Sequence, residues 1–412
     1  MKSGRVAASA ALVAVLLVCV ARAGGFSYDL RGYVKDYPAT WEQRSTSLGG
    51  AVESQTWFNS TRARLKGKWF ATSRLTLAAD YEARLLASNE ASGLSGLSGQ
   101  GSAGGLVDLT WTPVSREHVT LTHTFDRLYA QWYSPRFVAT VGRQRIAWGV
   151  ATYFSPLDKF APFAPAEIDK EEKAGVDAAL VSFPWGSLSN VEAVYAVQRI
   201  EEPPSPLASR TKETRHRLGA RLRTNVRDWD IALLGGRFDG ANVAGASLSG
   251  YIREAGVHGE VLFAHDAIRR TERYASYVYR RGNFVQASVG GSYGFAWRNL
   301  TASGELYYDG SGSADNAGYD WVGLSLGNRL TLARHYAAVS LTGLLTPLLT
   351  ASLVSLINLD EPAFLVQPQL EYSVEENLDV KLGVQVNNGD AQSEYGVMDN
   401  LFYLGVSWYF GA

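Results

Sequence analysis

The chain has 412 residues, of which 39 are basic and 40 acidic, and it contains one cysteine. Because the charges are nearly balanced and no basic tail is present, nucleic-acid binding has no support. The cysteine, Cys19, lies in the N-terminal stretch that we expect to be removed as a signal, so we expect no disulfide and no thiolate metal site in the mature chain. The 41 glycines, 21 tyrosines and 11 tryptophans are many for a soluble enzyme.

The first 23 residues have the three-part pattern of a secretory signal. Lys2 and Arg5 precede an apolar run over 7–20, and Ala21-Arg22-Ala23 follows as a small-residue cleavage site. The apolar run is short for a membrane span of roughly 20 residues. We therefore expect a signal peptide over 1–23, cleaved after Ala23, and a single domain over 24–412.

Beyond the signal, no apolar run reaches the roughly 18 residues of a membrane-spanning helix. The polarity instead alternates with period two, as in 363–374, where Phe364, Val366 and Leu370 share one face. Eighteen such segments, with sixteen as the alternative count, are expected at 26–36, 55–70, 75–87, 125–133, 136–145, 175–184, 189–199, 215–226, 229–239, 246–254, 255–265, 284–295, 298–309, 334–345, 348–358, 363–374, 377–388 and 400–410. The segment 320–330 fits either strand or loop.

Short and long connections alternate along these segments. Short ones fall at 134–135, 185–188, 227–228, 297, 346–347 and 375–376, and long ones at 88–124, 149–174, 200–214, 266–283, 310–333 and 389–399. Outer-membrane barrels have short periplasmic turns and long extracellular loops. The pattern predicts an all-β fold, a transmembrane antiparallel up-and-down β-barrel in the outer membrane of a Gram-negative bacterium.

If the apolar faces meet lipid, the polar faces line a lumen. A charge on the lipid face costs about 2–4 kcal/mol at the membrane midplane, so rows of charge on one face predict luminal side chains. The candidate pore-lining residues are Arg62, Arg64, Lys66, Lys68, Arg215, Arg217, Arg221, Arg223, Glu371, Asp379 and Lys381, with Asp80, Glu82, Glu305 and Asp309 on other walls. Two interpretations are open: the basic rows attract anions, or basic and acidic rows neutralise one another.

The stretch "GRQRIAWG", 142–149, ends a strand with unusual residues. Arg143 and Arg145 share the parity of apolar Val141, so they either lie above the lipid or follow a bulge that turns them inward. Gln144 lies between them, and Trp148 is expected, with Ile146, to mark the membrane boundary.

The next connection, 149–174, is rich in proline and phenylalanine, which predicts a packed loop of defined shape. It either folds into the pore and narrows it, or caps the rim from outside. In either case its acidic residues Asp169, Glu171 and Glu172 are candidate partners of the two arginines.

The three stretches "GRQRIAWG", "FSPLDKFAPF" and "EIDKEEKAGVDA" resemble a region found in a group of bacterial outer-membrane porin-like barrels. More remotely, this region is similar to the alginate-export and phosphate-selective porins. The motif covers about fifty residues, and elsewhere only the barrel pattern and the aromatic last strand correspond. The resemblance implies an outer-membrane channel without identifying its solute.

We therefore expect a porin-like channel for small polar or anionic solutes, without cofactor or metal. The alternatives are a barrel that sheathes a periplasmic multihaem cytochrome, and a polysaccharide-export channel. None of the six histidines lies in an H-E-x-x-H motif, so an enzyme is not expected. The expected partners are outer-membrane lipid and the barrel-assembly machinery, with a periplasmic or multihaem protein as a further candidate.

Overall fold

The computed structural model describes residues 27–47, 50–90, 105–160, 172–202, 211–273, 276–325 and 329–411. The expected signal peptide and the candidate residues Asp169 and Glu171 lie outside these ranges. No helix within the described part of the chain has the length and apolarity needed to cross a membrane.

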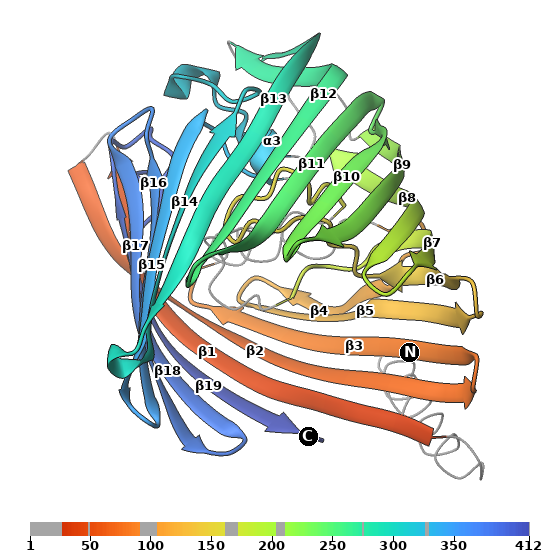
Figure 1. Cartoon of the computed structure of the whole chain (residues 1–412). Helices are drawn as coiled ribbons and strands as arrows, with labels where there is room; N and C mark the ends of the chain where they lie inside the picture. The colour runs from red at the N-terminus through yellow and green to blue at the C-terminus, as the bar shows by residue number, and fades with distance from the viewer. Residues whose placement is uncertain are drawn as a thin grey trace.

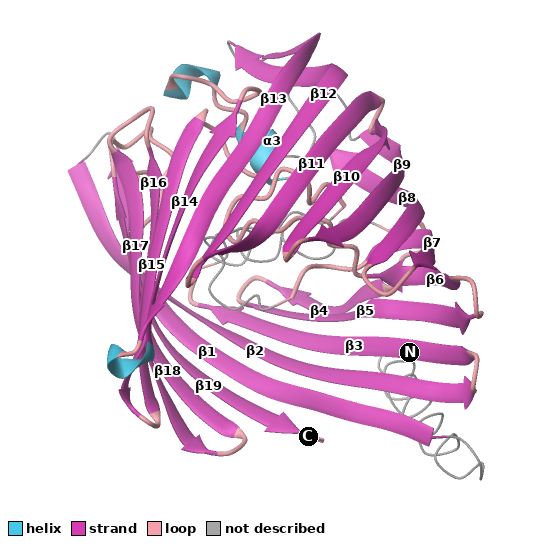
Figure 2. Cartoon of the chain, in the orientation of Figure 1, coloured by secondary structure: helices cyan, strands magenta, loops and turns pink. Residues whose placement is uncertain are grey.

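The fold is made almost entirely of antiparallel strands (Figures 1 and 2). The strands are β1 (Ser27–Ser47), β2 (Gly50–Thr72), β3 (Leu75–Ser88), β4 (Thr110–Arg116), β5 (Val119–Tyr133), β6 (Val138–Gln144), β7 (Val176–Trp185), β8 (Ser189–Glu202), β9 (Thr211–Val226), β10 (Trp229–Phe238), β11 (Ala241–Ile252), β12 (Ala255–Arg273), β13 (Ser276–Phe295), β14 (Leu300–Asp309), β15 (His335–Thr346), β16 (Leu349–Asn358), β17 (Ala363–Glu375), β18 (Leu378–Asn388) and β19 (Leu401–Phe410). The only helical pieces among the described residues are η1 (Trp297–Asn299), η2 (Asn316–Gly318) and α3 (Trp321–Ser325).

The strands close into a barrel with eighteen places in its wall. Apart from β3, which pairs with β5 and not with β4, each strand pairs with its neighbours along the chain, and β1 pairs with both β2 and β19 to close the ring. Strand β5 pairs with β3 along one edge, while its other edge pairs with β6 over 128–133 and with β4 over 119–124. The short strands β4 and β6 thus share one place, and the predicted eighteen-stranded antiparallel barrel is confirmed.

Two expected loops contain strand instead. The first is 88–124, which was predicted to be a loop. It contains β4, and β5 begins within it at Val119. The expected long loop over 266–283 is also wrong, because β12 continues to Arg273 and β13 starts at Ser276. This hairpin projects beyond its neighbours in Figure 1, where water can meet both faces and the apolar alternation is no longer required.

The expected sorting of faces is confirmed along the strands. Leu218, Leu370, Leu382 and Leu404 are 41–57% exposed on the outer surface, while the intervening positions hold glutamine, arginine, lysine and other polar residues. Strand β1 begins and strand β19 ends on the side of the short turns, such as 227–228 between β9 and β10. The segment 320–330 is part of a connection between β14 and β15 and contains the single turn of α3.

Candidate functional site

The connection between β6 and β7 folds into the barrel. In its described part, 145–160 and 172–175, the side chains of Ile146, Trp148, Phe154 and Leu157 are at most 3% exposed. Ile146 and Trp148 pack with residues of β7 to β12, and Phe154 packs with residues of β14 to β17. Of the two alternatives, the inward loop is therefore correct. The expectation that Ile146 and Trp148 mark the membrane boundary is wrong, because both side chains fill the lumen.

Two buried carboxylates on distant strands hold this loop. Glu260 of β12 accepts hydrogen bonds from the backbone N–H groups of Ala151 (2.7 Å) and Leu157 (3.2 Å). Glu305 of β14 accepts them from Thr152 (2.8 Å) and Phe154 (2.6 Å). Strand β14 lies eight places from β6 in the eighteen-place ring, so the loop crosses the lumen. Hereafter it is called the crossing loop, residues 145–175.

Asp158 fixes the shape of the crossing loop from within. One of its carboxylate oxygens accepts the N–H groups of Trp148 (2.8 Å) and Gly149 (3.0 Å), and the other pairs with Lys173 near the loop's end. Because Asp158 is only 3% exposed, these bonds are shielded from water and strengthened.

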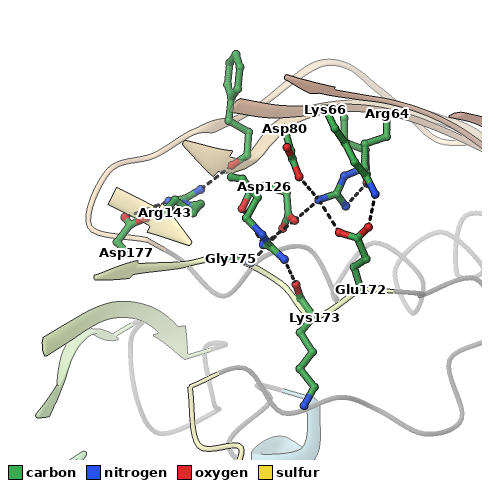
Figure 3. Close-up of polar contacts among 12 residues, drawn as sticks. Arg64, Lys66, Asp80, Asp126, Arg143, Glu172, Lys173, Gly175 and Asp177 are labelled. Carbon is green, nitrogen blue, oxygen red and sulfur yellow. Dashed lines mark hydrogen bonds and ion pairs between the residues drawn. The ribbon is translucent and has the colours of Figure 1, made fainter. Parts of the chain in front are cut away.

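Arg143 lies inside the barrel wall, where β6 ends. Its guanidinium pairs with Asp177 of β7 (2.7 Å) and donates to the carbonyl oxygens of Phe125 (3.4 Å) and Val107 (2.7 Å) (Figure 3). Its backbone is in register with outward-facing Leu128, yet the side chain is only 3% exposed. Of the expected partners, only Glu172 lies in the described residues, and Arg143 pairs with Asp177 instead of it. Beyond the end of β6, the Arg143 side chain thus supplies hydrogen bonds to carbonyl oxygens of the neighbouring chain segments.

Gln144 and Arg145 continue inward. The Gln144 amide donates to the carbonyl oxygens of Thr140 (3.1 Å) and Ala178 (3.0 Å), which also completes the end of the β6 ladder. Arg145 forms no ion pair with any residue in the described ranges, and its side chain lines two cavities. Its predicted pairing with Glu172 is wrong, because Glu172 pairs with Lys66 and Arg64.

The larger cavity has a volume of about 620 Å³ and is lined by residues at the start of β1 and the end of β19, on the side of the short turns. It is hereafter called the lower chamber. Five basic side chains and three acidic ones face it: Arg31, Lys66, Lys68, Arg127, Arg145, Asp29, Asp80 and Glu172. This leaves an excess of two positive charges. The smaller cavity, of about 200 Å³, is lined by Arg145, Lys173, Asp158, Leu330 and four residues of the crossing loop over 151–155, and is called the upper cavity.

The upper part of the β2 row is paired with acids. Arg64 contacts Asp126 (2.5 Å) and Asp80 (3.3 Å), and Arg62 lies 3.5 Å from Glu82. Lys68, lower on the strand, forms no ion pair with a described residue and faces the lower chamber.

The β9 row is also largely neutralised. Arg217 pairs with Asp239 (2.9 Å) and Arg221 with Glu192 (2.8 Å), while the exposed Arg223 lies 3.6 Å from Asp230. Arg215, on the same strand, is half-buried. For these positions the interpretation as mutually neutralising rows describes the geometry better than a free basic row.

The candidates on β17 and β18 form a separate group. Lys381 lies 3.2 Å from Glu371, and Asp379 accepts a hydrogen bond from Ser373 (2.8 Å). None of the three lines the lower chamber or the upper cavity.

Comparison with known proteins was informative for structure alone. No family model matches the chain, and no curated protein matches its sequence. Acinetobacter baumannii OccAB4 superposes with a TM-score of 0.56 at 8% identity, covering 93% of this chain and 98% of that one. Pseudomonas aeruginosa OccK8 (OprE) gives 0.55 at 9%, covering 93% and 98%. OpdK from Pseudomonas aeruginosa, solved with vanillate, gives 0.52 at 13%, covering 94% and 100%.

The chain has the fold of bacterial outer-membrane porins. Within this porin fold, several functional residues were missed from sequence. The sequence predicted Glu305 on the luminal wall and gave no prediction for Glu260. It did not predict that either residue holds a loop. Asp126 and Arg127 lie at a register shift between β3 and β5, where an extra residue lets neighbouring side chains share one face. An adjacent Asp-Arg pair inside an alternating strand is a signal that could have revealed this bulge.

One stretch of β13 carries the letters of a hydrolase nucleophile motif without its local fold. The letters Gly290-x-Ser292-x-Gly294 lie within the ladder of β13, and not at the strand-to-helix turn of a hydrolase elbow.

Proposed function

We propose that the protein is an outer-membrane channel that passes small anionic solutes, and that Arg145 selects their charge. The observation that carries this proposal is the position of Arg145 between the upper cavity and the lower chamber. A solute that travels between the two cavities passes this guanidinium, which has no ion-pair partner among the described residues.

The lower chamber supports the same direction of selectivity. Its excess of basic side chains lies in a space bounded by low-dielectric walls, where a field of one sign raises the local concentration of counter-ions. Lys68 and Arg145 carry most of this field, because Arg31, Lys66 and Arg127 are each paired with an acid. The apolar outer face supports a position in a membrane, and the proposal includes insertion into the outer membrane by the barrel-assembly machinery.

The alternatives have less support. A sheath for a multihaem protein needs a free lumen, and polysaccharide export needs a continuous wide path. The crossing loop occupies the middle of the lumen between β6 and β14, so it favours small solutes.

Reversal potentials in a salt gradient test the proposal. The purified protein is reconstituted in planar bilayers, and the double variant Arg145→Gln with Lys68→Gln is compared with the parent. We expect anion preference in the parent and a shift toward no preference in the variant, because the free charge of the chamber is gone. The shift should shrink in 1 M salt, where the screening length is about 3 Å.

Arg237→Gln is the matched control. Arg237 lies opposite outward-facing Leu218 on β9, so its loss removes a positive charge without changing the lumen. An unchanged reversal potential in the double variant would refute charge selection by Arg145. A parent that inserts but passes no current would refute the channel itself.

A further inference from the structure

Long connections meet above the lumen at the ends of β14 to β17. The connection 310–334 contributes Tyr319 and Leu332, the connection 389–400 contributes Tyr395, and the crossing loop contributes Phe154 to one buried cluster. All four side chains are at most 4% exposed. A disturbance in one of these connections is therefore transmitted by direct packing to the others.

Glu394 lies at the polar centre of this cluster and is only 5% exposed. Its carboxyl group accepts hydrogen bonds from the Tyr336 hydroxyl (2.5 Å) and the Asn358 amide (3.1 Å). The Tyr336 hydroxyl in turn accepts the backbone N–H of Leu332 (3.0 Å). One carboxyl group thus connects 389–400 to 310–334 through a single tyrosine.

The groups that face Glu394 are neutral or acidic. Glu361, in the turn 359–362, accepts the backbone N–H of Glu394 (2.8 Å) and an Asn358 amide hydrogen (3.1 Å). The other titratable neighbours are the phenols of Tyr319, Tyr336 and Tyr395, and Asp360 is engaged by His335 (2.7 Å). No basic side chain in the described part of the chain forms an ion pair with Glu394 or Glu361.

We propose that Glu394 is a proton-operated latch, which holds 310–334 and 389–400 together over the pore when protonated and releases them when ionised. Ionisation places a second negative charge beside Glu361 in a buried site, and no cation compensates for it. The neutral carboxylic acid avoids this repulsion and keeps the packing of the cluster intact.

The latch is coupled to the solute path through two contacts. Leu330, in the connection 310–334, lines the upper cavity together with Tyr153 and Arg145. Phe154 of the crossing loop stacks on Tyr307, with ring centroids 5.3 Å apart, and contacts Tyr336 at 5.4 Å. Release of 310–334 therefore loosens one wall of the upper cavity and one support of the crossing loop.

The direction of the pH dependence follows from burial. Burial raises the pKa of Glu394 to about 7, above the ordinary value of 4.5, and Glu361 adds to the rise. The latched form thus binds the proton more tightly than the released form. Its advantage is complete below pH 4.5 and is lost as the pH rises through 7, with the released population growing by up to about tenfold per pH unit in between.

Single-channel recording at pH 5 and pH 8 tests the latch. We expect steady current in the parent at pH 5 and frequent transitions between conductance levels at pH 8. Glu394→Gln keeps a neutral group that accepts the same hydrogen bonds, so it should be steady at both values. Tyr336→Phe removes the hydroxyl that joins the two connections and should show the transitions already at pH 5.

Glu371→Gln is the control, because it removes a luminal acid paired with Lys381 and should keep the parental pH dependence. Proteolysis of the folded parent provides a second test that needs neither a variant nor current. Cleavage within 310–334 and 389–400 should be faster at pH 8 than at pH 5, relative to other loops. Equal cleavage at both pH values, or a Glu394→Gln channel with parental pH dependence, would overturn the latch.

Discussion

At the scale of single residues, buried acids organise the lumen of this barrel. Glu260 and Glu305 each accept several backbone N–H groups of the crossing loop and are 4% and 3% exposed. A carboxylate that receives three or four such bonds satisfies donors that would otherwise be buried without partners. These acids are therefore loop anchors, whereas the acids that face β2 and β9 mainly balance the arginines of those strands.

Removal of one anchor should open the pore. Glu305→Ala leaves the N–H groups of Thr152 and Phe154 unsatisfied. The loss is roughly 3 kcal/mol, or about a hundredfold in the population of detached loop. We expect higher and noisier single-channel conductance from this variant. Ser303→Ala, on the same face of β14, should conduct like the parent, and an identical conductance for both variants would contradict the anchoring role.

At the scale of elements, the short strand β6 explains the motif Arg143-Gln144-Arg145. The wall above β6 is completed by β4 and by the residues before it, with Gly105 bridging to Gln198 of β8. Side-chain bonds from Arg143 and Gln144 tie these pieces to β5 and β7. Burial of the Arg143 guanidinium is tolerated because each of its three nitrogens donates to a carbonyl or carboxylate oxygen.

Breaking the Arg143–Asp177 pair should destabilise the barrel strongly. Arg143→Met leaves the half-buried Asp177 without its cation and with the backbone N–H of Val107 as a remaining donor, at a cost of up to about 3–5 kcal/mol. The double variant Arg143→Met with Asp177→Leu should lose less than the sum of the two single variants. Urea unfolding of the reconstituted barrel measures each loss. Strict additivity in this cycle would show that the pair is not coupled.

At the scale of the whole molecule, closure decides which side chains meet lipid. The wall is continuous from β1 to β19, so alternate residues of every strand face opposite solvents. The outer face carries leucine, valine and aromatic residues, such as Trp132, Trp408 and Phe402, at 45–51% exposure. Stability of the barrel is therefore a property of the membrane as well as of the chain.

Neighbouring substitutions on β16 should separate the two faces. Leu353 is 36% exposed on the outer face, and Ser352 precedes it on the luminal face. Leu353→Arg should lower the free energy of unfolding by about 2–4 kcal/mol, and Ser352→Arg by much less. Unfolding in lipid vesicles provides the measurement, and equal losses would mean that the assigned faces are wrong.

The sequence by itself determined the local features of this protein. Alternation along single strands is a local property, so 363–374 and 377–388 were placed within one or two residues, and the luminal parity of Arg64 and Arg221 followed. The count of eighteen places also follows from this pattern, because each place needs one strand long enough to cross the membrane.

Only the tertiary structure decided which side chains meet across the lumen. Arg143 contacts Asp177 and not Glu172. Glu305 contacts residues about 150 positions earlier, because chain closure brings together strands that are far apart in sequence. The predictions of a loop over 266–283 and of Trp148 at the membrane boundary were wrong for a related reason. Polarity alternates only where one face of a strand meets lipid and the other meets the lumen. A strand that extends beyond the membrane and a loop inside the lumen do not meet this condition.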